Sequence, residues 1–150
     1  MKVFDNLADF ESAAGTELGP TDWLEVDQQR VDKFADATDD HQWIHVDPDR
    51  AASGPFGGTI AHGLLTLSLL PRFMHELYRV DNVAMAINYG FNKVRFITPV
   101  PVGTKLRASS RITQVDELDT AVQATLVTTI EVEGAAKPAA VIESIVRYVG

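Results

Sequence analysis

The stretch HGLLTLSLLPRFMHELYR, residues 62–79, decides the fold. It is the longest segment in which apolar residues recur at helical spacing, and they cover most of the helix circumference. A helix that is apolar nearly all round is buried on most sides, so we expect this one at the centre of the molecule. Pro71 should kink or split it, because the carbonyl of Leu67 loses its normal hydrogen-bond partner.

Beyond this helix the apolar residues alternate with polar ones, which is typical of strands. Strands are expected at Val83–Tyr89, Phe91–Thr98, Lys105–Val115, Thr120–Val132 and Ala139–Val149. The connections between them are short, which favours antiparallel neighbours. One buried helix followed by long antiparallel strands predicts an α+β domain in which the sheet wraps around the helix. This chain alone cannot cover the sheet's other face, so we expect pairing with a second copy in a dimer.

The residues before the central helix predict shorter elements. Residues 1–18 have roughly helical apolar spacing and are expected to form a helical lead-in. A short strand is predicted at Trp23–Val26. Helices are predicted to run to about residues 38 and 52, each preceded by a capping aspartate, Asp27 and Asp47. The segment between these two helices is too irregular to predict as helix or strand.

Composition limits the classes of protein that the chain can belong to. Its 150 residues fit one domain. A formal net charge of −8 argues against nucleic acid or anionic lipid as the main partner. The absence of cysteine excludes disulfides, thiolate metal ligands and cysteine nucleophiles, and fits a cytoplasmic protein. No apolar run reaches the roughly 18 residues of a membrane span, and the N-terminus lacks the apolar core of a signal peptide.

The segment between the two short helices places Asp40 and His45 five residues apart. A carboxylate and an imidazole that both reach one water molecule can transfer protons near neutral pH. Flanking acidic residues would favour a charged His45. Two other interpretations stay open: Asp40 caps a backbone amide while His45 lies on the surface, or His41, His45 and nearby carboxylates bind a metal ion.

The segment Gly57–Gly63 opens the central helix and is the second candidate for chemistry. Glycine allows a ligand to approach the backbone closely, and the first amides of a helix lack internal partners. A thioester or amide oxygen placed there would be stabilised as its negative charge grows. The alternative is an ordinary turn in which His62 only caps the helix.

Basic residues crowd one short part of an otherwise acidic chain. They are Lys93, Arg95, Lys105, Arg107 and Arg111. Such a patch could hold a phosphorylated small molecule. It could equally be the solvated face of a strand with mixed charge. No phosphate-binding glycine loop, dinucleotide fingerprint or serine-hydrolase motif occurs in the chain.

Three motifs, in this order and spacing, resemble those of the MaoC-like (R)-specific enoyl-CoA hydratases. The first is Asp40–His45 followed by Asp47-Pro48, and the second is Ile60–Leu65 at the start of the central helix. The third is Asn88–Phe96 followed by Pro99–Gly103. The likeness runs from about residue 20 to the end of the chain. It implies a hot-dog fold, usually dimeric, in which an antiparallel sheet wraps a long helix.

The resemblance also implies an activity: reversible addition of water to a trans-2-enoyl thioester of coenzyme A, giving the (R)-3-hydroxyacyl thioester. It assigns the catalytic aspartate to Asp40 and the catalytic histidine to His45. The thioester oxygen would meet a backbone amide near Gly63, with His62 and Gln42 as further substrate-binding candidates.

Coenzyme A would be part of the substrate, so no separate cofactor and no metal are expected. Lys93 and Arg95 are candidates for contact with its phosphates. Three alternatives remain. The first is another enzyme on this fold, either a dehydratase acting on acyl carrier protein or a thioesterase. The second is a non-catalytic acyl-CoA binding protein, and the third is a metal-dependent enzyme.

The chain departs from the family pattern close to the proposed catalytic pair. The family commonly has Gly just before its aspartate, where this chain has Asp39. It commonly has Asn-Pro where this chain has Gln42-Trp43. Trp43 is much larger than proline and removes a rigid bend, so these changes bear on the shape of the loop and on which acyl chains fit.

Overall fold

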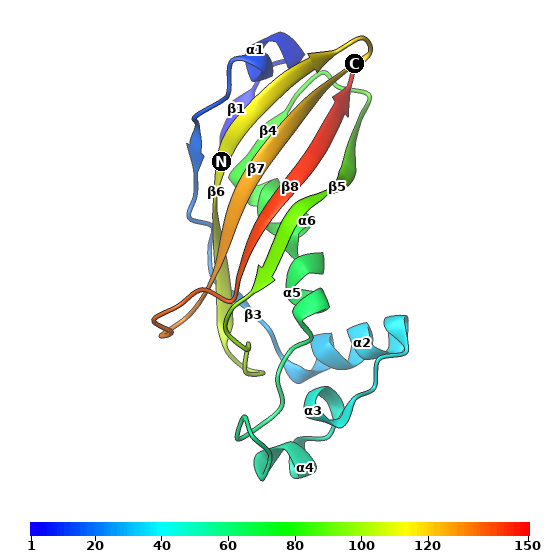
Figure 1. Ribbon diagram of the computed structural model, residues 1–150, viewed down its shortest axis with the longest axis vertical. Helices are drawn as coiled ribbons and strands as arrows, with labels where there is room; N and C mark the ends of the chain where they lie inside the picture. The colour runs from blue at the N-terminus through cyan, green and yellow to red at the C-terminus, as the bar shows by residue number, and fades with distance from the viewer.

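The computed structural model describes residues 1–150, and its dominant feature is a curved antiparallel sheet folded around two consecutive helices (Figure 1). The strands of this sheet are β2 (Glu17–Leu18), β3 (Leu24–Glu25), β5 (Met85–Phe96), β6 (Lys105–Leu118), β7 (Ala121–Val132) and β8 (Ala140–Val149). They run in the order β2-β6-β7-β8-β5, and β3 also pairs with β6. The predicted α+β class, with a sheet wrapped around a helix, is confirmed.

The expected central helix is present as two helices, α5 (Gly63–Ser68) and α6 (Leu70–Leu77). Pro71 lies in the first turn of α6, where its missing N–H costs nothing, so the predicted split is confirmed. Both helices lie against the inner face of the sheet, and Phe73 of α6 is only 1% exposed.

A small parallel pair of strands alters what the sequence predicted at two places. β1 (Lys2–Phe4) pairs with β4 (Tyr78–Val80). The expected helical lead-in over residues 1–18 is therefore wrong, since only α1 (Leu7–Glu11) is helical there. The central helix ends at Leu77 rather than 79 for the same reason. The local spacing of apolar residues cannot reveal β1, because its partner β4 follows the central helix and is more than 70 residues away in sequence.

The long strands follow the predicted alternation. In β7 every second residue is buried, from Val122 to Val132, and the intervening residues are partly exposed. The two strands expected between residues 83 and 98 are instead the single strand β5, which pairs with β8 through irregularities at Asn88/Gly90 and Phe91/Lys93. Bulges of this kind shift the alternation, which is why the sequence suggested two strands.

Apolar side chains between the helices and the sheet form two adjoining clusters. One surrounds Phe73 and contains 15 buried residues, and the other surrounds Phe10 and contains 13. Met74 packs against both clusters, which places α6 between them. None of the helices has the length and apolar character that crossing a membrane would require.

Three short helices, α2 (Gln28–Thr38), α3 (Trp43–Val46) and α4 (Pro48–Ala52), gather beside the beginning of α5 (Figure 1). α2 and α4 were predicted, and the side chains of Asp27 and Asp47 cap them as expected. α3 was not predicted. It is a single turn inside the segment for which the sequence predicts neither helix nor strand, and it carries His45.

Candidate active site

The turn after α2 presents Asp40 to the site. α2 ends at Thr38, and Asp39 caps it in the left-handed conformation, with φ 59° and ψ 19°. Aspartate tolerates this conformation better than most residues other than glycine, which explains how Asp39 can stand where the resembled family commonly has Gly. Asp40 follows with its side chain 49% exposed.

α3 carries His45 into the interior of the protein, where the residue is only 6% exposed. Its Nδ1 lies 2.7 Å from the backbone carbonyl oxygen of Ile60. A carbonyl oxygen only accepts hydrogen bonds, so Nδ1 carries the proton and Nε2 is left as an acceptor. This is the tautomer that a general base needs.

The environment of His45 favours its neutral form. Burial lowers the pKa of His45 below its ordinary value of 6.5, and the neighbouring His62 acts in the same direction. The hydrogen bond to the Ile60 carbonyl and the charge of Asp40 act the other way and are outweighed. Asp40 thus favours a charged His45, as expected of the nearby carboxylates, but burial penalises the charged imidazolium more, so the net shift in pKa is downward.

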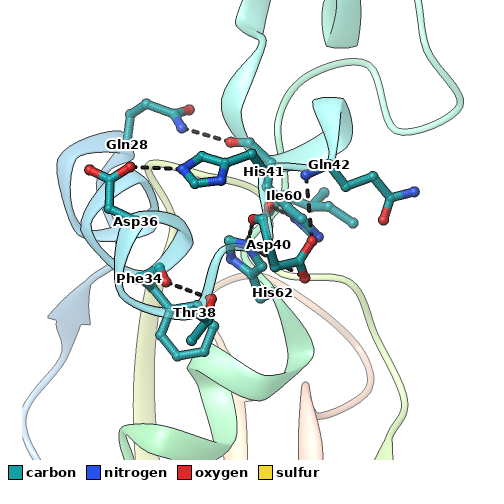
Figure 2. A network of polar contacts seen from close by, with 10 residues as sticks. Gln28, Phe34, Asp36, Thr38, Asp40, His41, Gln42, Ile60 and His62 are labelled. Carbon is teal, nitrogen blue, oxygen red and sulfur yellow. Dashed lines mark hydrogen bonds and ion pairs between the residues drawn. The ribbon is translucent and has the colours of Figure 1, made fainter.

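His62 completes a compact group with the predicted pair. Its Nε2 lies 2.9 Å from the backbone carbonyl oxygen of Asp40 and 3.9 Å from Oδ2 of the same residue. Figure 2 shows His62 and Asp40 side by side. The ring of His62 stacks on that of His45, with centroids 3.8 Å apart and planes at 25°. One side-chain ligand atom from each of Asp40, His45 and His62 lies within 4.8 Å of the others. The structure thus brings Asp40 and His45 to one place, with His62 beside them.

A cavity of about 330 Å³ opens beside His45 at the beginning of α5. Its lining includes His45, Ile60, Gly63, Thr66, Phe96 and Val100. Gly63 is the first residue of α5, a position whose amide has no partner within the helix. A Cβ atom on Gly63 would lie 3.1 Å from the ring of Phe96, so glycine lets that ring lie against the helix start. The amide and the imidazole therefore border the same cavity.

Gln42 contributes its backbone to the site. Its N–H donates a long hydrogen bond of 3.4 Å to Oδ1 of Asp40, and its carbonyl accepts from the N–H of His45 at 2.9 Å. The side chain is exposed and points away from His62 (Figure 2). Gln42 thus links the two predicted catalytic residues through its main chain.

A metal site that includes His41 does not form. Nε2 of His41 lies 2.8 Å from Oδ1 of Asp36, on the exposed side of the turn. The groups spaced to hold a cation are Asp40, His45 and His62. One nitrogen of His45 and one of His62 already contact a backbone carbonyl oxygen, and the second nitrogen of His62 is buried.

Lys93 and Arg95 lie away from this group of residues. Val94 between them pairs with Ile142, which is fully buried on the inner face of the sheet. Because side chains alternate along a strand, Lys93 and Arg95 belong to the outer face. Within one chain, the structure does not bring them to the cavity.

Sequence reasoning missed the side chains that hold α3 in place. Nε2 of Gln28 donates to the backbone carbonyl of His45 at 2.7 Å, and the hydroxyl of Thr59 donates to Oε1 of Gln28 at 2.7 Å. These partners are 17 and 31 residues apart in sequence. Nothing in the local sequence distinguishes Gln28 from other polar residues on an exposed helix face.

The fold and the site define a hydratase or dehydratase, and the chain belongs to the MaoC-like family. The family model described as MaoC like domain matches residues 9–135. The sheet wrapped around a helix is accordingly the hot-dog fold. The chain is 60% identical over 150 residues to the 3-hydroxyacyl-thioester dehydratase Z of Mycobacterium tuberculosis strain H37Rv, with 99% of both chains covered.

Solved structures agree with this assignment. The (R)-hydratase from A. caviae involved in PHA biosynthesis superposes with a TM-score of 0.72 and 27% identity, covering 89% of this chain and 94% of the other. The R-hydratase PhaJ1 from Pseudomonas aeruginosa also superposes with a TM-score of 0.72, covering 89% of this chain and 79% of the other. Its identity of 21% supports the fold alone.

Proposed function

We propose that this chain, as a single MaoC-like domain, is an (R)-specific enoyl-CoA hydratase that adds water reversibly to trans-2-enoyl-CoA. The observation that carries the proposal is that the Asp40 carboxylate lies within 4.8 Å of a ring nitrogen of His45, beside the cavity at the start of α5. The Ile60 carbonyl holds the proton of that imidazole on Nδ1, which leaves Nε2 free to accept one. Proton-transfer groups next to a helix start suit a reaction in which charge gathers on a carbonyl oxygen. The name and the 27% identity of the A. caviae (R)-hydratase support the same activity.

In the proposed hydration, a water molecule lies between Asp40 and His45, and its oxygen forms the new bond to C3. One water proton passes to Nε2 of His45 while the C2–C3 double bond opens and its electron pair moves toward the thioester oxygen. The imidazolium then returns a proton to C2, so the enzyme ends in its starting state. Such proton transfer contributes about 10²–10⁴-fold to a rate.

Asp40 and the amides at the start of α5 stabilise the charges that develop during the reaction. The Asp40 carboxylate orients the water and stabilises the transient imidazolium of His45. The amides at the start of α5, beginning with Gly63, face the thioester oxygen as its negative charge grows. Loss of one such donor typically costs about 10²–10³ in rate.

Coenzyme A is the proposed carrier of the acyl group. The net charge of −8 would repel an acidic acyl carrier protein. The M. tuberculosis relative is named for a 3-hydroxyacyl thioester without a carrier, so a dehydratase acting on acyl carrier protein is the alternative. Lys93 and Arg95 remain candidates for the phosphates of coenzyme A. Because both lie on the outer face of the sheet, that contact would be made around its edge or by a second copy of the chain.

A second copy is also part of the proposal, as a homodimer joined through β5. This strand forms one edge of the sheet and leaves large apolar side chains between 43% and 54% exposed. They are Met85, Ile87, Tyr89, Phe91 and Phe96. A long apolar edge is normally a site for further pairing. Pairing two β5 strands about a two-fold axis would cover these side chains and the free backbone groups.

The experiment that tests the function follows the enoyl absorbance of crotonyl-CoA with the purified wild-type protein, Asp40→Asn and His45→Gln. We expect hydration by the wild type and a loss of at least about 10²-fold in each variant, with thermal stability unchanged. His41→Gln is the matched control and should keep wild-type activity, because His41 faces Asp36. Equal rates in all four proteins would reject the roles of Asp40 and His45.

The alternatives give different results in the same assay. Release of free thiol from crotonyl-CoA would identify a thioesterase. Turnover of the crotonyl group only when it is attached to acyl carrier protein would identify the other dehydratase. Binding without any absorbance change for either carrier would identify a non-catalytic acyl-CoA binding protein. Loss of activity with a chelator, restored by a divalent cation, would identify a metal-dependent enzyme.

A further inference from the structure

We propose that His62 is a positioning residue, which holds Asp40 by its main chain and His45 by its ring so that the two catalytic groups meet. The inference rests on the proposed function, since it concerns the same pair. It replaces the expectation that His62 contacts the substrate, and nothing in the family match or in the names of the relatives assigns this role.

The hydrogen bond to Asp40 sets the tautomer of His62. The backbone carbonyl of Asp40 can only accept, so Nε2 of His62, 2.9 Å away, carries the proton. Nδ1 of His62 is then an acceptor, and it is buried without any hydrogen-bond partner. An unsatisfied buried polar atom is uncommon and calls for an explanation. Burying a polar atom without a partner costs free energy, and an apolar side chain of the same size would fill this space without that cost.

The contacts of His62 supply that explanation, because they connect three separate segments. Asp40 belongs to the turn after α2, His45 to α3, and His62 precedes the first residue of α5. The ring of His62 stacks at 3.8 Å on that of His45, while its edge binds the main chain of Asp40. Phe34 of α2 packs on His62 with ring centroids 4.9 Å apart. His62 therefore places both catalytic residues relative to the start of α5.

Direct contact between His62 and the substrate does not fit these observations. The residue is 2% exposed, its Nδ1 has no accessible surface, and Nε2 is already engaged by Asp40. Its side chain also makes no cap to the backbone of α5. Both nitrogens are thus unavailable to a molecule in the cavity, and the ring can act only through its neighbours.

Two substitutions separate the two contacts of His62. His62→Gln keeps an N–H donor at the reach of Nε2, and His62→Phe keeps a ring to stack on His45 but has no donor. We expect His62→Phe to lower kcat for crotonyl-CoA at least about tenfold with KM within about twofold, which is the signature of a misplaced catalytic group. His62→Gln should recover a substantial part of kcat. The exposed His75 of α6 provides the control His75→Gln, which should leave both constants unchanged.

A measurement on the wild type gives a test that requires neither a variant nor activity. In ¹⁵N-histidine NMR spectra, the neutral imidazole of His62 should carry its proton on Nε2, the nitrogen that faces the Asp40 carbonyl. A proton on Nδ1, or a KM effect of His62→Phe without a kcat effect, would overturn the inference. A wild type inactive on every enoyl thioester would instead refute the proposed function. An active wild type with an unaffected His62→Phe variant would refute the positioning role alone.

Discussion

Opposing interactions act on the imidazole of His45. The Ile60 carbonyl fixes its proton on Nδ1 and, with the charge of Asp40, would stabilise an imidazolium. Burial disfavours the imidazolium and prevails, so the pKa of His45 is lowered from 6.5. The group is held ready to accept a proton at Nε2 without holding one at neutral pH.

The first prediction concerns the dependence of hydration on pH. The proposed hydration needs neutral His45, so kcat/KM should be constant near pH 7 and fall as the pH drops through the lowered pKa of His45. We therefore expect the acid limb to be centred below 6.5 in a profile measured with crotonyl-CoA.

His41 provides the control for this profile. The hydrogen bond to Asp36 raises the pKa of His41, so its titration would place a limb above 6.5. His41→Gln should leave the measured limb in place. A limb above 6.5 that disappears in His41→Gln would mean that the wrong histidine has been assigned.

The second prediction concerns Gly63, whose lack of a side chain leaves room for the ring of Phe96 in the lining of the cavity. In Gly63→Ala the new Cβ would lie 3.1 Å from the ring of Phe96, which is 50% exposed and can move. Displacing the ring should reduce kcat/KM for enoyl-CoA by about tenfold while the free energy of unfolding changes by less than about 1 kcal/mol. Steady-state kinetics and urea denaturation measure the two quantities.

A double variant tests the cause of that loss. Adding Phe96→Leu to Gly63→Ala removes the ring that the new Cβ meets, and should restore part of kcat/KM. If the double variant loses as much kcat/KM as Gly63→Ala and Phe96→Leu lose in sum, the ring of Phe96 is not involved in the effect of Gly63→Ala.

At the scale of the elements, the candidate active site depends on how α2 ends. The left-handed conformation of Asp39 turns the chain so that Asp40 faces His62. The resembled family commonly has glycine at this position, which adopts the conformation without a steric penalty. Asp39 makes the same turn, but an aspartate only tolerates the left-handed conformation.

The third prediction follows from this difference. Asp39→Gly should raise the free energy of unfolding by about 0.5–1 kcal/mol, because it relieves the strain of a left-handed side chain. Urea denaturation measures the change. Asp22→Gly, at an exposed position without positive φ, should be neutral or slightly destabilising. If both variants lose stability equally, Asp39 is not strained.

At the scale of the whole molecule, one edge of the sheet is well covered and the other is not. β2 and β3 lie beside β6 at one edge, whereas β5 forms the other edge with its apolar side chains exposed. The proposed homodimer places the contact between subunits on β5, whose last residue, Phe96, also lines the cavity.

The fourth prediction tests this arrangement. Ile87 lies on β5 and is 43% exposed. Ile87→Lys would place a charge in the paired edge, so sedimentation velocity should show a shift from twice the chain mass to the chain mass. Leu118→Lys, at the exposed end of β6, is the control and should not change the mass. A wild type that sediments as a monomer would contradict the proposed pairing.

Local pattern determined much of this protein. The alternation in β7 and the apolar spacing of residues 62–77 depend only on which side chains must leave water, so both could be predicted. The capping aspartates before α2 and α4 act on amides three residues away and are equally visible. The motif around Asp40 and His45 indicated the chemistry because these two residues are only five positions apart in the chain.

Only the tertiary structure decided the rest. The pairing of β1 with β4, the support of α3 by Gln28 and the contact of His62 with Asp40 join residues that are far apart in sequence. The lowered pKa of His45 likewise depends on burial by distant segments, which outweighs the nearby carboxylates that the sequence shows. Alternation and capping are short-range effects, whereas desolvation and long-range hydrogen bonds exist only once the chain has folded.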